Sequence, residues 1–318
     1  MRSQKLIFLF SLFIFVSIFS FSQKVFAEEL INDPYLVEGY QTASGTGALF
    51  RVNIDADSVI EFKTQTSVHL RIDASDKMII IENKPSETEV ATSITISNLR
   101  PSATYYKYSD SYLNLEEITT DVNGSLTYQQ DISDFHSVFI QTIKSTKIIS
   151  PTSTGGSCSS IGTWNNATKT CTLTQDVFET IQINGDGITL DGAGHTVQGS
   201  SVGFGVYIPQ KSAVVVKNLT IKGFFWGINA TQTSQSNFYS NILKNNVRGG
   251  ILFSSSQNIT LQNNQLIGDS FFATGNTVND YTHSIDISNT INGEPILYLV
   301  NAHDEKYSGL LPTFKYEG

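Results

Sequence analysis

The chain has 318 residues and carries 20 Lys and Arg against 29 Asp and Glu, a net charge of −9 at pH 7. This acidic balance argues against nucleic-acid binding, because contacts to phosphate need a basic surface. Only 15% of the residues are charged, and Ser, Thr and Asn supply much of the other polar surface, which is typical of extracellular β proteins.

The first 27 residues have the form of a secretory signal peptide. Arg2 and Lys5 precede an apolar run over 6–21, and Val25 and Ala27 place small residues at a cleavage site. An uncleaved anchor is the alternative, but the run is shorter than the roughly 20 residues that span a bilayer. We therefore expect a mature protein that is secreted or held at the cell surface, without membrane contact after cleavage.

Residues 28–150 are predicted to form an antiparallel β-sandwich. Short β-branched and aromatic runs alternate with turn-forming residues over this region, with almost no helical periodicity. The expected strands are 48–54, 59–62, 68–72, 78–81, 93–96, 105–108, 126–128 and 137–143. The segment 94–106, ITISNLRPSATYY, resembles the part of fibronectin type III domains in which a Leu-x-Pro loop precedes a Tyr-rich strand.

A Ser-, Thr- and Gly-rich stretch at 144–157 is predicted to be a linker, and a second domain is expected over 151–318. Cys158 and Cys171 are the only cysteines of the chain. In an oxidising compartment such a close pair is expected to form a disulfide. A metal site is the weaker alternative, because two thiols without a nearby His make a poor zinc site.

The second domain repeats itself every 22 to 23 residues between positions 180 and 268. A period this short in β-prone sequence predicts a β-solenoid whose coils stack on one another. Two series mark the coils: the turn positions His195, Asn218, Asn241 and Asn264, and the glycines Gly205, Gly227 and Gly250. We expect Asn side chains to stack in a turn ladder and the glycines to permit the backbone angles of a tight corner.

The opening of this domain resembles NosD-like right-handed parallel β-helix proteins, a group of carbohydrate-binding and sugar-hydrolase repeats found on prokaryotic cell surfaces. The resemblance rests on CSSIGTWNNATKTCTLTQD (158–176), GITLDGAGHTV (187–197) and IDISNTINGEPILYLV (285–300). It covers nearly all of 155–301 and implies a pectate-lyase-like fold without implying an active site. The period fails beyond 268, so we expect a solenoid that is cut short at its C-terminal end.

The sequence gives no basis for assigning catalytic residues, a metal or a cofactor. A polysaccharide lyase on this fold needs a carboxylate cluster for Ca²⁺ and a base, and a glycoside hydrolase needs two facing carboxylates. Acids of the second domain are instead scattered along the chain, among them Asp186, Asp191, Asp269, Asp280 and Asp286.

Aromatic residues next to the repeating glycines are the candidate ligand contacts. They are Phe204, Tyr207, Phe224, Phe225 and Trp226. Stacked rings on neighbouring coils suit the C–H faces of sugars, and the alternative is packing under the sandwich domain. We therefore predict a non-enzymatic module that binds a polysaccharide or surface glycan. The alternatives are a structural or adhesive protein that meets another surface protein, and a polysaccharide lyase or glycoside hydrolase.

Five Asn-x-Ser/Thr triplets are candidate N-glycosylation sites in a secreted chain. They begin at Asn123, Asn166, Asn218, Asn229 and Asn258. A sequence this rich in Asn and Thr also produces such triplets by chance.

Overall fold

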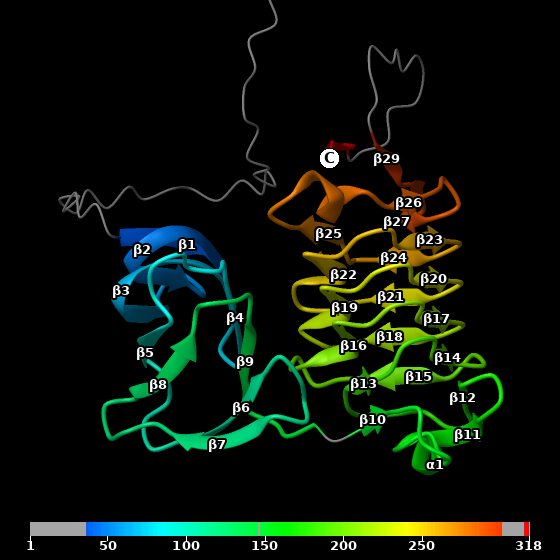
Figure 1. Ribbon diagram of the computed structural model, residues 1–318, viewed down its shortest axis with the longest axis horizontal. Coiled ribbons are helices and arrows are strands. Elements are labelled where there is room, and N and C mark those ends of the chain that lie inside the picture. The colour runs from blue at the N-terminus through cyan, green and yellow to red at the C-terminus, as the bar shows by residue number, and fades with distance from the viewer. Residues whose placement is uncertain (1–35, 146, 301–314, 318) are drawn as a thin grey trace, which may run out of the picture. The chain divides into compact units, whose positions relative to one another are not determined.

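The computed structural model describes residues 36–145, 147–300 and 315–317 (Figure 1). The predicted signal peptide lies outside these ranges. Across the described residues the chain is almost entirely β, and helix is limited to α1 (Cys158–Ile161) and the 3-10 helix η1 (Val278–Tyr281). None of the helices found in these ranges combines the length and apolar character needed to span a membrane.

The N-terminal part is a β-sandwich, as predicted. Its strands are β1 (Leu36–Tyr40), β2 (Thr42–Asn53), β3 (Val59–Ala74), β4 (Met78–Asn83), β5 (Ala91–Ser97), β6 (Thr104–Ser109), β7 (Leu115–Thr119), β8 (Leu126–Asp131) and β9 (Ser137–Gln141). All neighbouring strands in it are antiparallel except β1 and β2. The predicted strands 59–62 and 68–72 are one long strand, β3.

Strand β3 belongs to both layers of the sandwich. Its first half pairs with β5, which pairs with β8, and its second half pairs with β4, which continues to β9, β6 and β7. Apolar side chains from both layers, such as Phe62 and Ile94 on one side and Ile81 and Ile140 on the other, meet in a common core. Burial of this apolar surface holds the two layers together.

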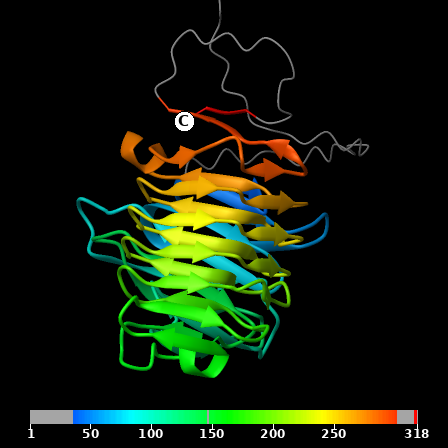
Figure 2. The same ribbon diagram turned by 90° about the vertical axis from the view of Figure 1, so that its right-hand side faces the viewer.

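The C-terminal part is a β-helix with three sheets, here named S1, S2 and S3 (Figure 2). S1 contains β10 (Lys147–Ile149), β13 (Ile181–Ile183), β16 (Phe204–Pro209), β19 (Trp226–Thr231), β22 (Gly249–Ser254) and β25 (Phe271–Thr274). S2 contains β11 (Gly162–Asn165), β12 (Thr170–Leu173), β14 (Thr189–Asp191), β17 (Val215–Lys217), β20 (Asn237–Tyr239), β23 (Thr260–Gln262) and β26 (Ser284–Ile285). S3 contains β15 (Thr196–Gln198), β18 (Thr220–Lys222), β21 (Ile242–Lys244), β24 (Gln265–Ile267), β27 (Thr290–Ile291) and β28 (Glu294–Pro295). Two further strands, β29 (Leu297–Leu299) and β30 (Lys315–Glu317), pair with each other.

Each coil contributes apolar residues from all three sheets to a continuous core. Val206, Ile228 and Ile251 pair in register along S1 and are fully buried, as the repeat predicted. β10 lies inside the predicted linker and already pairs with β13. The sandwich and the β-helix belong to one compact unit, and the predicted domain boundary at 150/151 stays a prediction.

The glycine series is aligned as expected, but for a different reason. Gly205 and Gly227 lie within strands at ordinary backbone angles, so they make no left-handed corner. A Cβ on Gly205 would lie 2.6 Å from the carbonyl oxygen of Gly227, and one on Gly227 2.5 Å from that of Gly250. These positions are glycine because the next coil approaches too closely for a side chain.

The Asn turn ladder is present, with one residue misassigned by the sequence spacing. Asn241 accepts hydrogen bonds from the backbone of Leu219, and Asn264 and Asn289 continue the column on the next coils. Asn218 lies one position ahead of the column, in a left-handed conformation (φ 56°), and donates to Asp191 instead. His195 lies at the register position of Leu219 on the preceding coil, because Thr196 pairs with Thr220, and its ring faces Asp176 at 3.4 Å.

Replacing Asn264 by Ala should lower the free energy of unfolding by about 2–3 kcal/mol. The amide of Asn264 accepts from the backbone of Asn241 and donates to the carbonyl of Phe238, and both groups are buried. Urea unfolding measures the loss. Gln262→Ala, an exposed neighbour, is the control and should change stability by less than about 0.5 kcal/mol. Equal effects would mean that the ladder does not hold the coils.

The predicted disulfide between Cys158 and Cys171 is confirmed. It links α1 to β12 at the N-terminal end of S2, where both cysteines are fully buried. An open end of a β-helix exposes unpaired strand edges. Strands β11 and β12 form an antiparallel hairpin there, so this covalently closed segment caps the first coils.

Candidate functional site

The five aromatic residues predicted to contact a ligand are all buried, so they offer no ring face to a sugar in this structure. Phe204, Tyr207, Phe225 and Trp226 lie on the outer face of S1 beneath the sandwich, and Phe224 lies in the β-helix core. Their exposed fractions do not exceed 3%. For the four residues other than Phe224, the structure shows the alternative, packing under the sandwich.

Aromatic contacts between the sandwich and S1 explain this burial. The ring of Tyr207 stacks on that of Phe204 at 4.9 Å between centroids, and Phe139 of β9 meets both rings edge-on. The hydroxyl of Tyr207 donates to the backbone carbonyl of Asp110 at 3.1 Å. Such ring contacts add stabilisation beyond that of the buried area alone. These rings therefore stabilise the packing of the sandwich on S1.

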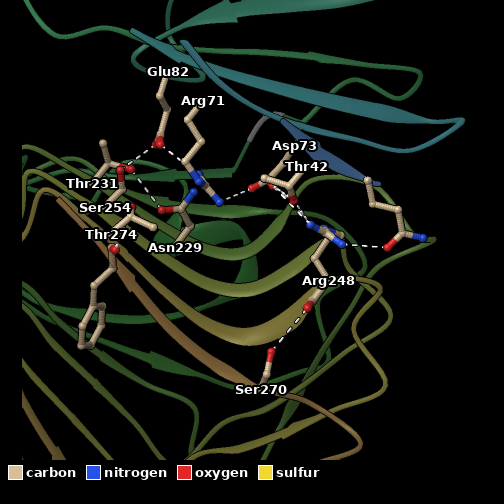
Figure 3. Close-up of polar contacts among 12 residues, drawn as sticks. Thr42, Arg71, Asp73, Glu82, Asn229, Thr231, Arg248, Ser254, Ser270 and Thr274 are labelled. Atoms are coloured by element: carbon tan, nitrogen blue, oxygen red, sulfur yellow. Dashed lines mark hydrogen bonds and ion pairs between the residues drawn. The ribbon is translucent and has the colours of Figure 1, made fainter. Parts of the chain in front are cut away.

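A network of charged groups joins the same two surfaces (Figure 3). Arg71 of β3 contacts Asp73 and also Glu82, the latter at 2.9 Å. Arg248 of the β-helix reaches Asp73 at 3.3 Å, and Ser254 donates to Glu82 at 2.7 Å. The carboxylates of Asp73 and Glu82 are 0% and 5% exposed. This network therefore connects the sandwich to the β-helix away from solvent.

Opposite charges decide the ionisation of Arg71. Burial by itself would lower the pKa of this guanidinium, but the charges of Asp73 and Glu82 outweigh burial and raise the pKa above its ordinary value. The group therefore stays charged at any pH at which the protein is folded, and both carboxylates have a fixed cationic partner. We assign this network a structural role.

The outer face of S2 presents a polar column to solvent. Asp191, Lys217, Tyr239 and Gln262 pair in register on four successive coils. The residue before each of them is fully buried, so alternation directs the four side chains outward. Neighbouring strands are about 4.8 Å apart. A linear ligand along the coils would meet one of these groups at each step.

Short contacts fix the first three groups of this column. The ammonium of Lys217 lies 3.1 Å from the carboxylate of Asp191 and 5.9 Å from the ring centre of Tyr239. The amide of Asn218 and the backbone N–H of Ala193 each donate to Asp191 at 3.0 Å. Asp191 and Asn218 were noted in the sequence for other reasons, and only the coil register brings them together with Lys217 and Tyr239.

The ionisation of this column suits binding rather than proton transfer. Burial acts to raise the pKa of Asp191, but hydrogen bonds from Asn218, Ala193 and Lys217 lower it below its ordinary value. The hydrogen bond to Asp191 raises the pKa of Lys217. An efficient general acid or base has a pKa near the working pH. The pKa values of Asp191 and Lys217 are both shifted further from neutral pH.

The other acids noted in the sequence do not join this column. Asp186 accepts from the backbone of Ser212, Asp269 from Asn246, and Asp280 from the backbone of Asn276. Across the described ranges, no group of three or more His, Cys, Asp or Glu side chains is placed to hold a metal ion.

The predicted glycosylation triplets differ in accessibility. Asn123, Asn166 and Asn258 are exposed, and Asn218 is half-buried. Asn229 is fully buried on the outer face of S1, where Thr231 donates to its side chain at 3.0 Å. A glycan cannot be attached to Asn229 in the folded protein, so Asn229 is removed from the candidate glycosylation sites.

A comparison with known protein families finds a match over the coils of the β-helix. Residues 135–293, half of the chain, match the family described as right handed beta helix region. The chain belongs to this right-handed β-helix family. The match includes all of β10 to β27 and therefore the whole polar column of S2. The handedness predicted from the sequence is confirmed.

A solved structure with some likeness to this β-helix protein is the catalytic domain of a GH87 alpha-1,3-glucanase in complex with nigerose. The sequence identity is 12% and the TM-score is 0.21. The match covers 71% of this chain and 61% of the length of that domain. No curated protein sequence matches the chain.

Proposed function

We propose that this β-helix protein is an extracellular or cell-surface carbohydrate-binding module without catalytic activity, and that the outer face of S2 is its glycan site. The register-aligned column of Asp191, Lys217, Tyr239 and Gln262 supports the proposal most directly. Its carboxylate, ammonium and amide groups match the donors and acceptors of sugar hydroxyls. The half-buried ring of Tyr239 adds the apolar contact that sugar faces favour.

The fixed charges of the column favour binding over catalysis. Lys217 is paired with Asp191 and has a raised pKa, so it is a poor base for removing a proton from a sugar ring. We include in this proposal that the β-helix is of the NosD-like kind and that the sandwich is of the fibronectin type III kind, as the sequence resemblances imply. They imply a module that presents its coils to glycans outside the cell.

Replacing Tyr239 by Ala should reduce glycan binding at least about tenfold without unfolding the protein, because the ring supplies the apolar part of the site. A glycan array with the wild type, Tyr239→Ala and the control Tyr40→Ala measures this. Tyr40 is 65% exposed on β1, so its loss should leave binding unchanged. Absence of binding to any glycan would contradict the proposal, and release of unsaturated or reducing-end products would favour the enzymatic alternative.

A further inference from the structure

The outer face of S3 carries two lysines on neighbouring coils. Lys222 of β18 pairs in register with Lys244 of β21. The preceding residues, Ile221 and Leu243, are fully buried, so both lysine side chains leave the sheet on its outer face. Since adjacent strands are about 4.8 Å apart, two like charges start one coil apart on the same surface.

These two lysines differ from Lys217 in their surroundings. Lys217 is neutralised by Asp191, and Lys107 and Lys147 likewise have carboxylates within 3.0 Å. Within the ranges that the structure describes, neither Lys222 nor Lys244 makes an ion pair. Asp176, at the edge of S3, is near enough to interact electrostatically with Lys222.

The neighbours of the two lysines along their column carry no charge. Gln198 precedes Lys222 on the coil below, and Ile267 follows Lys244 on the coil above. A second outward column of S3 runs beside it and contains Thr196, Thr220, the apolar Ile242 and Gln265. The face therefore combines two cationic anchors with hydroxyl and amide groups, within a chain whose net charge is −9.

This arrangement favours an anionic ligand. Like charges directly opposite each other on paired strands are unfavourable, and an anionic group between them relieves the repulsion. Carboxylates and sulfates accept strong charge-assisted hydrogen bonds from ammonium groups. We propose that the outer face of S3 is a second binding site, in which Lys222 and Lys244 hold the carboxylate or sulfate groups of an acidic polysaccharide that runs along the coils.

A polysaccharide fits this face better than a membrane does. A lipid surface would meet the whole acidic protein and be repelled by its net charge, whereas a single linear chain meets only the strip along S3. Because the two lysines start about 4.8 Å apart, neighbouring anionic groups of one extended glycan chain can reach both of them. The site is separate from the column of S2 and does not depend on Tyr239.

The test compares two double variants with the same change in charge. Lys222→Gln/Lys244→Gln removes the pair, and Lys63→Gln/Lys211→Gln removes two lysines that lie elsewhere. Binding to polygalacturonate, dextran sulfate, neutral dextran and phosphatidylserine vesicles is measured by calorimetry at low and high ionic strength. We expect the wild type to bind at least one acidic glycan, with an affinity that falls as salt is added.

The Lys222/Lys244 variant should lose about tenfold in affinity for the acidic glycan at low salt, while the control variant keeps it. Tyr239→Ala should also keep it, which separates this site from the site on S2. Equal losses in both lysine variants, binding to neither acidic glycan, or tighter binding to the vesicles than to the glycans would each overturn the proposal.

Discussion

Replacing Arg71 by Leu should lower the free energy of unfolding by about 3–5 kcal/mol. Among the residues that the structure describes, the change leaves the buried carboxylate of Glu82 with Ser254 as its remaining hydrogen-bond partner, and it removes one of the two cations that face Asp73. A buried charge without its counter-charge is costly because it cannot recover the solvation of water. Urea unfolding of the full chain measures the loss.

Two further variants establish the cause. Arg51 pairs with Glu61 at the surface, where the side chains are 43% and 35% exposed, so Arg51→Ala should cost less than about 1 kcal/mol. Adding Glu82→Gln to Arg71→Leu should recover part of the loss, since the unpaired charge of Glu82 disappears while Asp73 keeps Arg248 as its partner. A loss as small as that of Arg51→Ala would show that solvent reaches the network.

Replacing Phe238 by Ala should lower the free energy of unfolding by about 3–5 kcal/mol, because it empties a filled position of the β-helix core. Phe238 is fully buried and lies 5.9 Å from the ring of Phe253, between centroids. Tyr239 is the next residue of β20 and points to the other side of the sheet. Thermal and urea unfolding compare Phe238→Ala with Tyr239→Ala.

Tyr239→Ala should cost less than about 1 kcal/mol, because its ring packs only from the outside of the coil. The pair of variants therefore separates the core face of S2 from its outer face within two residues. Similar losses at both positions would mean that the strand does not alternate between core and solvent as described, and would remove the outward column on which the proposed function rests.

The coil period could be read from the sequence, but the register of single residues could not. The landmarks Asn241 and Asn264 are placed correctly, whereas Asn218 is displaced by one position because the coil before Asn241 is one residue shorter than the spacing assumed. The coils differ in the number of residues they contain, and the extra or missing residues lie in the turns between strands. Interstrand hydrogen bonds fix the register, and these join residues more than 20 positions apart.

The covering of S1 could not be predicted from local pattern alone. Phe139 of β9 contacts Phe204 and Tyr207, which are more than 60 residues away in the chain. One signal was available: the strand 204–209, FGVYIP, is apolar or aromatic at nearly every position, whereas the strand 237–239, NFY, alternates. Apolar residues at both inward and outward positions indicate a strand covered on both faces, and this argues against an exposed aromatic platform.

The polar column of S2 could not be predicted from the sequence either. Its members are separated by irregular intervals in the sequence, and each is an ordinary surface residue by itself. Asp191 and Lys217 belong to coils with different turn lengths, so only their pairing across β14 and β17 shows that they are neighbours. Tyr239 gives no sequence signal apart from its place one residue after a core phenylalanine.

A crystal structure of the chain with an oligosaccharide selected on the glycan array tests the account most directly. We expect density for the sugar along the outer face of S2, with hydrogen bonds to Asp191 or Lys217 and a ring stacked on Tyr239. Density for that sugar confined to the sandwich, with the S2 column left in contact with solvent alone, would contradict it.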